Sequence, residues 1–374
     1  MSKPLSGYRI IELAGIGPGP YAGMLLSDMG AEVILVNRPG FAVPTVHDRN
    51  KRSIVIDLRK PEGAQVLLDL VAKSDALIEG VRPGVVERLG IGPDEAMSVN
   101  PKLVYGRMTG WGQTGPWAKT AGHDLNYISI TGALGAMGRK GEPPMPPLNL
   151  IGDYGGGTMF LVTGMLAALL QAERTGKGEV VDAAMIDGVN SMMSMFHSLS
   201  GLGQWKPERE ANLLDGGMPF YRCYETSDGK YMAVGCIEPQ FFAEFLSLLE
   251  IDPESFGGQM DKREHAGQHA KLEALFKTKT RDEWAEIFDG SDACTSPILD
   301  YTEAAEHPQN KARGGLDTHG PFVHPRPAPV FGGQYEFDDP VLPAINGGRA
   351  EITDLLGYDQ DKVAQLIEQK ILTQ

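Results

Sequence analysis

The N-terminal stretch YRIIELAGIGPGPYAGMLLSDMGAEVILV, residues 8–36, decides the fold class. It contains an apolar run at 8–13, a loop rich in Gly and Pro, a helical segment at 21–29 and a β-branched run at 32–36. Strand-like runs with helical spacing between them continue along the chain at 53–58, 75–79 and 103–107. This alternation predicts an α/β fold with a parallel, doubly wound sheet, whose ligands bind beyond the carboxyl ends of the strands.

The second half of the chain has a different pattern. Residues 201–219 interrupt the strand–helix alternation and are expected to form a linker after a large domain at 1–200. The segment 221–237 predicts a β-hairpin with Ser-Asp-Gly-Lys at its turn, and helix-like segments follow it. We therefore expect a smaller α+β domain at residues 220–310.

Composition narrows the functional classes. The chain has 374 residues and a formal net charge of -15, and an acidic surface of that size argues against a nucleic-acid partner. Its three cysteines fit neither a disulfide framework nor a zinc site. The N-terminus lacks the apolar run of a signal peptide, and the best candidate for a membrane span, 159–170, is too short to cross a bilayer. We expect a cytoplasmic protein without a membrane partner.

The turn GPGPYA at 17–22 joins the first strand to the first helix. It fits the dinucleotide-binding fingerprint with Ala in the last place, and Arg38 after the second strand could mark a phosphate, as in NADP binding. Its two prolines, however, remove N–H groups that should face a pyrophosphate. We therefore favour a tight structural turn with a ligand passing nearby, and an NADP-dependent oxidoreductase remains an alternative.

Basic residues gather near the expected strand ends of this acidic chain. The group consists of Arg38, Arg49, Lys51, Arg52, Arg59 and Lys60, with Arg82 and Arg88 in the same region. Solvated surface charge is the better explanation for any one of them. As a group, they could hold the phosphates of a nucleotide-like ligand.

His123 and Glu238 are candidates whose positions alone do not decide their roles. His123 stands before a helical pattern that runs to Met137, and Glu238 stands before Pro239, where a helix is expected to begin. A histidine at a helix start is as often structural as functional, and a glutamate there is usually a cap-region acid. Glu238 could orient a histidine only if two domains or subunits meet.

Asp153 begins a long helical pattern that reaches Arg174. Capping of the helix would by itself explain an aspartate at this place. Three glycines at 155–157 are not explained by capping, because they weaken the first helical turn. We therefore expect a close approach to this backbone, whose N–H groups could hold an oxyanion.

Several motifs occur together and in order: GWGQTGP at 110–116, GHD at 122–124, GDYGGG at 152–157, DAAM at 182–185, IEPQF at 237–241 and DAC at 292–294. Over residues 5 to about 329, they resemble the α-methylacyl-CoA racemases of the family III CoA-transferase superfamily. The Gly-His-Asp and Ile-Glu-Pro-Gln-Phe segments are racemase-like, whereas the Gly-Asp with its following glycines is shared with the transferases.

The resemblance implies a Rossmann-like large domain that a return segment at 311–374 completes, a small domain, and a homodimer of interlocked subunits. The active site would lie between the large domain of one subunit and the small domain of the other. CoA would enter only as part of the substrate, and neither a metal ion nor a redox cofactor would be needed. The expected CoA-binding residues are Ala14, Ile16, Arg38, Arg82 and Arg88.

The activity that the resemblance implies is interconversion of (2R)- and (2S)-2-methylacyl-CoA thioesters through an enolate. One proton leaves one face of the α-carbon and another returns to the opposite face, so two acid/base groups are needed. His123 and Asp153 match these roles, Glu238 would orient His123, and Asp124 and Tyr127 are further candidates near the base. The main alternative is a CoA transferase with Asp153 as covalent nucleophile. A non-catalytic CoA-binding relative is a further alternative.

Overall fold

The structure is a computed structural model that describes residues 3–40, 44–332 and 340–373. The chain divides into two compact units. The large unit consists of Met1–Thr131, Pro147–Met193 and Ala312–Gln374, and the small unit of Gly132–Pro146 and Ser194–Lys311. The segment expected as a linker, 201–219, thus lies in the small unit, and the expected return segment lies almost entirely in the large one.

The large unit is built on a six-stranded sheet of order β3-β2-β1-β4-β5-β6, and all of its strand pairs are parallel. Its strands are β1 (Arg9–Leu13), β2 (Glu32–Asn37), β3 (Arg52–Val55), β4 (Ala76–Glu79), β5 (Val104–Thr109) and β6 (Val180–Ala184). This is the doubly wound order of Rossmann-like sheets, so the predicted α/β fold is confirmed. The order reverses between β1 and β4, and such sheets bind ligands at this switch point.

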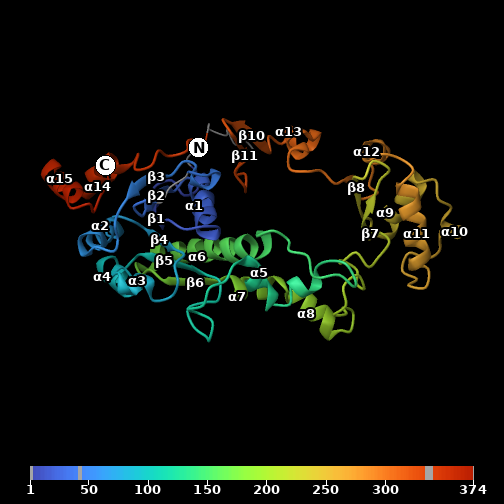
Figure 1. Cartoon of the computed structure of the whole chain (residues 1–374), viewed down its shortest axis with the longest axis horizontal. Coiled ribbons are helices and arrows are strands. Elements are labelled where there is room, and N and C mark those ends of the chain that lie inside the picture. The colour runs from blue at the N-terminus through green and yellow to red at the C-terminus, as the bar shows by residue number, and fades with distance from the viewer. Residues whose placement is uncertain (1–2, 41–43, 333–339, 374) are drawn as a thin grey trace. The chain divides into compact units, whose positions relative to one another are not determined.

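Helices cover both faces of this sheet (Figure 1). On one face, a core forms between the strands and the helices α1 (Pro18–Asp28) and α6 (Met159–Thr175). On the other face, the core includes α2 (Pro61–Val71), α3 (Val85–Arg88), α4 (Pro93–Val99), α14 (Arg349–Leu356) and α15 (Gln360–Glu368). Because both faces are covered, β1, β2 and β4 are nearly continuous runs of buried residues.

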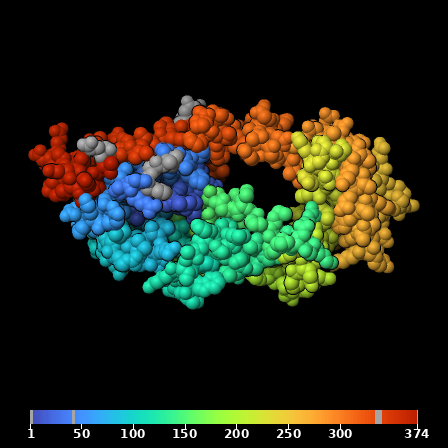
Figure 2. Space-filling view, viewed as in Figure 1, coloured from blue at the N-terminus to red at the C-terminus, as the bar shows by residue number. Residues whose placement is uncertain are grey.

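The C-terminal residues pack against the N-terminal half of the large unit. The backbone N–H of Asp57 donates to the carbonyl oxygen of Ile371 at 2.9 Å, and that of Val55 donates to Oδ1 of Asn346 at 3.1 Å. Figure 2 shows the red C-terminal residues lying against the blue N-terminal ones. Two short strands of the same unit, β10 (Leu316–His319) and β11 (Phe322–Pro325), form a separate antiparallel pair.

The helix that carries Asp153 is longer than its sequence pattern indicates. A π-helix, η3 (Leu150–Thr158), continues directly into α6, so that one helix spans Leu150–Thr175. This length and composition would suffice to cross a membrane, which corrects the estimate based on 159–170. Half of the most apolar part of this helix is buried in the structure.

The small unit contains an antiparallel sheet with the strand order β7-β8-β9. The predicted hairpin is confirmed: β7 (Tyr221–Glu225) and β8 (Tyr231–Gly235) flank a turn in which Gly229 has a φ of 74°. The other elements are η2 (Leu134–Ala136), α8 (Ser194–Gly201), α9 (Pro239–Leu248), α10 (Pro253–Phe256), α11 (His265–Phe276), α12 (Arg281–Phe288), β9 (Thr295–Pro297) and η4 (Glu303–Glu306), with α13 (Pro308–Ala312) at the boundary of the units. An aromatic core joins the sheet to the helices, which makes this unit the expected α+β part.

Candidate active site

A cavity of about 300 Å³ lies at the carboxyl ends of β1, β4 and β5, beside the switch point of the sheet. Loops and helix ends from distant parts of the chain form its walls. The predicted site residues that line it are Ile16, Arg82, His123, Tyr127 and Asp153. The fold therefore brings the two acid/base candidates, His123 and Asp153, into one pocket.

Asp153 is half-buried in the first turn of η3. Its carboxylate oxygen Oδ2 accepts a hydrogen bond from Nδ2 of Asn149 at 3.2 Å, and its backbone N–H donates to Oδ2 of Asp124 at 2.7 Å. Burial raises the pKa of Asp153 above its ordinary value, although the Asn149 hydrogen bond and the nearby His123 oppose the shift. The Asp153 side chain is not the cap of this helix, because the helix begins before it at Leu150.

The three glycines at 155–157 are explained by packing between helices. A Cβ atom added to Gly156 would lie 2.6 Å from Cγ2 of Val189, in α7 (Met185–Met192), and one added to Gly188 of α7 would lie 1.9 Å from the carbonyl oxygen of Gly156. The predicted close approach is confirmed, and the approaching group is α7. The prediction that N–H groups at this helix start hold an oxyanion is wrong for Asp153 and Tyr154. The N–H of Asp153 donates to Asp124, and that of Tyr154 donates to the carbonyl oxygen of residue 149.

The turn between β1 and α1 rests on the Asp153 side chain. Gly17 has a φ of 75°, and a Cβ atom added to it would lie 2.9 Å from Oδ2 of Asp153. The hydroxyl of Thr158 in η3 donates to the carbonyl of Pro18 at 2.8 Å. Gly17 thus gives the carboxyl group room, and the preference for a tight structural turn is confirmed. A carboxyl group beside this turn also disfavours a pyrophosphate, and with it the nicotinamide alternative.

His123 is exposed and immediately precedes α5 (Asp124–Ser129). Its backbone N–H donates to Oδ1 of Asn126 at 3.0 Å. The helix ends well before Met137, since Gly132 follows it with a φ of 82°, so the predicted length of this helix is wrong. From its position at the start of α5, exposed His123 is one of the residues that line the pocket.

Tyr127 lines the pocket, and Asp124 of the same helix supports it through its hydrogen bond with the backbone of Asp153. The Tyr127 hydroxyl donates to the carbonyl of Gly122, just before His123, and its ring packs edge-on against Trp111 at 4.8 Å between centroids. A Cβ atom added to Gly110 would overlap the Tyr127 ring, so the glycine-rich loop is shaped to accept it. Burial raises the pKa of Tyr127 and of Asp124. Tyr127 thus holds the residue before His123, and Asp124 holds the backbone of Asp153.

The family model of CoA-transferase family III matches residues 5–339. The chain belongs to CoA-transferase family III. The α-methylacyl-CoA racemase of Mus musculus is 41% identical over 98% of this chain and 97% of that protein, and that of Homo sapiens is 40% identical over the same shares. The crystal structure of a CAIB/BAIF family protein from Brucella suis matches with a TM-score of 0.79 at 27% identity, covering 95% of this chain and 100% of that one.

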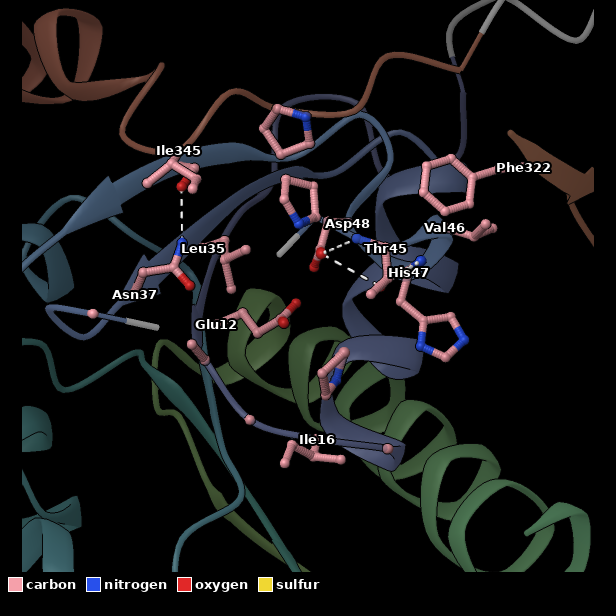
Figure 3. Close-up of a pocket in the computed structure, with 18 residues that line it drawn as sticks. Glu12, Ile16, Leu35, Asn37, Thr45, Val46, His47, Asp48, Phe322 and Ile345 are labelled. Carbon is pink, nitrogen blue, oxygen red and sulfur yellow. Dashed lines mark hydrogen bonds between the residues drawn. The ribbon is translucent and has the colours of Figure 1, made fainter. Parts of the chain in front are cut away.

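In this family III chain, the residues expected to bind CoA are spread along one edge of the sheet. Ala14 and Ile16 line a larger cavity of about 690 Å³ on the β2 and β3 side of the turn (Figure 3), and exposed Arg38 follows β2 next to it. Ile16 is 84% exposed and belongs to this cavity and to the acid/base pocket. Arg88 lines a separate cavity near the start of α2, and does not line the other two.

The basic residues that were expected to bind phosphates do not form one phosphate-binding group. Lys51 is fully buried and pairs with Glu12 at 2.6 Å, and Arg49 is buried against Asp28. The prediction is therefore wrong for these two cations. Arg52 pairs with a neighbouring glutamate and Arg59 with an aspartate, while Lys60 donates to backbone carbonyls near the C-terminus and lines the same cavity as Arg59 and Arg88.

Glu238 lies in the small unit of this family III chain, where it is exposed and directly precedes α9. Its expected role toward His123 stays a prediction. The sequence analysis gave no role to Asn149, whose side chain donates to the Asp153 carboxylate. The two residues are four positions apart, a spacing that brings side chains together on one face of a helix. Among the described residues, no cluster of three His, Cys, Asp or Glu side chains is arranged to hold a metal ion.

Proposed function

We propose that this chain is a racemase that interconverts the (2R) and (2S) forms of 2-methylacyl-CoA thioesters by moving the proton on the α-carbon. The observation that carries the proposal is the convergence of His123 and Asp153, from two separate helix starts, on one small pocket at the switch point of the sheet. The racemases of mouse and human, at 41% and 40% identity over nearly the whole chain, support the same activity.

The reaction needs one group that accepts a proton and another that donates one. In one direction, neutral His123 takes the α-proton, and the C–H electrons pass into the enolate of the thioester. Protonated Asp153 then gives a proton to the opposite face of the carbon, and the roles exchange in reverse. Burial, which raises the pKa of Asp153, increases the protonated fraction that this step requires.

The CoA portion of the substrate would lie along the exposed edge between Arg88 and Ile16. Ala14, Ile16 and Arg82 line the cavities at this edge, and Arg38 and Arg88 add positive charge for the phosphates. We further propose a homodimer in which Glu238 of one copy orients His123 of the other. Loss of activity in Glu238→Ala, and its recovery on mixing with an inactive His123→Ala protein, tests that arrangement.

The proposal is tested by incubating one enantiomer of a 2-methylacyl-CoA in deuterated water. We expect the wild-type protein to incorporate one deuterium at the α-carbon and to lose the optical purity of the substrate. His123→Ala and Asp153→Ala should lose both signals, whereas His307→Ala and Asp94→Ala, which lie outside the pocket, should retain them. Full activity in either of the first two variants would rule out the two-group mechanism.

The second candidate is CoA transfer, which the family name and the shared GDYGGG segment favour. Asp153 would attack the thioester carbonyl, and its carboxyl group would carry the acyl group and then CoA as covalent intermediates. Hydroxylamine treatment in the presence of acyl-CoA distinguishes the two activities. Inactivation of Asp153 only under these conditions supports transfer, and α-deuterium incorporation without any transfer to an acceptor acid supports the racemase.

A further inference from the structure

A buried ion pair lies beside the turn that carries Gly17. Nζ of Lys51 donates to Oε2 of Glu12 at 2.6 Å and to the carbonyl oxygen of Pro20 at 3.0 Å. Neither charged side chain has any exposed surface. Glu12 is on β1, before the turn, and Pro20 is in the first turn of α1, after it. Lys51 therefore ties together the two ends of the turn.

Stability alone does not explain this pair. Removing two charges from water costs free energy that a single ion pair seldom recovers, so a buried pair is weak evidence for a stabilising role. Oε1 of Glu12 also receives no hydrogen bond from the described residues. The fold nevertheless accommodates the pair closely, since a Cβ atom added to Gly23 would lie 1.8 Å from Oε2 of Glu12.

The turn that Lys51 holds is in direct contact with the proposed catalytic acid. Gly17 leaves just enough room for Oδ2 of Asp153, and Thr158 of the same helix donates to the carbonyl of Pro18. The rings of Tyr21 in α1 and Tyr154 in η3 pack with their centroids 4.6 Å apart. A displacement of the turn would therefore displace the surface on which the Asp153 carboxyl group rests.

We infer that Lys51, through its pairing with Glu12, is a positioning residue that holds the 15–20 turn against the Asp153 carboxyl group. The inference rests on the proposed function only in taking Asp153 as the group that exchanges the α-proton. Figure 3 shows Glu12 extending from its strand into the region between Ile16 and Asp48. Oδ1 of Asp48 lies 3.7 Å from Nζ of Lys51 and adds a second, weaker counter-charge.

The test removes both charges together, so that neither partner remains buried alone. The variant is Glu12→Gln combined with Lys51→Met, and the matched control is Asp28→Asn combined with Arg49→Met. The control pair is also buried in the large unit, where Nη2 of Arg49 lies 2.5 Å from Oδ2 of Asp28 and Nη1 of Arg49 donates to the carbonyl oxygen of Pro325 at 2.6 Å.

We expect the Glu12/Lys51 variant to lose roughly 10- to 100-fold in kcat for α-deuterium incorporation, because small displacements of a reacting group are costly. Its KM should change less than its kcat, although Glu12 and Ile16 of the displaced turn also line the cavity expected to hold CoA. The control variant should lose thermal stability but keep its kcat. A kcat within about threefold of wild type in the Glu12/Lys51 variant, or an equal loss in the control, would overturn the inference.

Backbone hydrogen exchange, followed by mass spectrometry, gives a measure that does not depend on activity. The amides of residues 150–158 should exchange faster in the Glu12/Lys51 variant and at the wild-type rate in the control. Unchanged exchange in the first variant would also overturn the inference. If the wild-type protein moves no α-proton, the proposed function fails, and hydrogen exchange alone then tests whether Lys51 holds the turn in place. If the double variant does not fold, Lys51→Gln, which is too short to reach both Glu12 and Pro20, is judged by the same criteria.

Discussion

The contact between Gly17 and Asp153 gives the sharpest test of the site geometry. Gly17 has φ 75° and ψ -113°, a conformation that side chains other than glycine rarely adopt, so Gly17→Ala should cost about 1–3 kcal/mol in the free energy of unfolding. The new Cβ would also lie 2.9 Å from Oδ2 of Asp153, whereas ordinary contact begins at 3.4 Å. Either the turn or the carboxyl group must move by about half an ångström to relieve this contact.

A displacement of this size has a predictable kinetic effect. A shift of about 1 Å in a reacting group can cost 100-fold in rate, so half that shift should lower kcat for α-deuterium incorporation by roughly tenfold. The assay measures deuterium incorporation into a 2-methylacyl-CoA at saturating substrate, together with the thermal midpoint of each protein. KM should change less than kcat, because the substrate contacts in the cavity are otherwise kept.

The control for backbone strain is Gly7→Ala. Gly7 belongs to the same unit and has a φ of 96°, but a Cβ atom added to it would meet nothing within 4 Å. We expect Gly7→Ala to lose stability by about 1–3 kcal/mol and to keep its kcat. The reasoning is refuted if Gly17→Ala folds and turns over at the wild-type rate, or if Gly7→Ala loses kcat to the same extent.

Three further predictions concern the supports of the site. Asp124→Ala leaves the Asp153 N–H without its acceptor and should lower kcat for deuterium incorporation by roughly tenfold or more. Asp124→Asn keeps an oxygen atom at that place and should retain most of the activity in the same assay. Gly188→Ala places a Cβ 1.9 Å from the carbonyl of Gly156 and should lower the free energy of unfolding in urea by about 1–3 kcal/mol. Burial raises the pKa of Glu12 from 4.5 to about 7, although Lys51 opposes the shift. Between these two values the folded state holds a proton that the unfolded state has lost, so the free energy of unfolding should fall as pH rises through this range. The fall should be smaller in Glu12→Gln, whose side chain does not titrate.

The sequence predicted those parts of the fold that local patterns determine. The apolar runs at 8–13 and 32–36 became β1 and β2, and the hairpin around Gly229 formed as expected, because strand periodicity and turn chemistry are short-range properties. The meeting of His123 and Asp153 was implied only by the family resemblance. The two residues are 30 positions apart in sequence, and no local pattern brings them together.

The sequence could not show which cations are buried. Arg49 and Lys51 stand among polar residues and resemble a solvated basic patch, but their partners, Asp28 and Glu12, lie 21 and 39 positions away on other elements. Only the tertiary fold decides that these charges are paired inside the protein. The π-helix at Asp153 was hidden for a similar reason: its glycines weaken a helix locally, and the compensation comes from α7, which packs against them.

The choice between moving a proton and moving CoA depends on the ionisation of Asp153. A transferase needs this carboxyl group ionised as a nucleophile, whereas a racemase needs it protonated in one direction of the reaction. Burial raises the pKa of Asp153 and the nearby Asp124 adds to the shift, while the hydrogen bond from Asn149 and the nearby His123 partly oppose it. The raised pKa favours a proton donor over a nucleophile. His123 lines the same pocket and would supply the second acid/base group, for which CoA transfer has no evident use, so the environment of Asp153 and the position of His123 favour the same reaction.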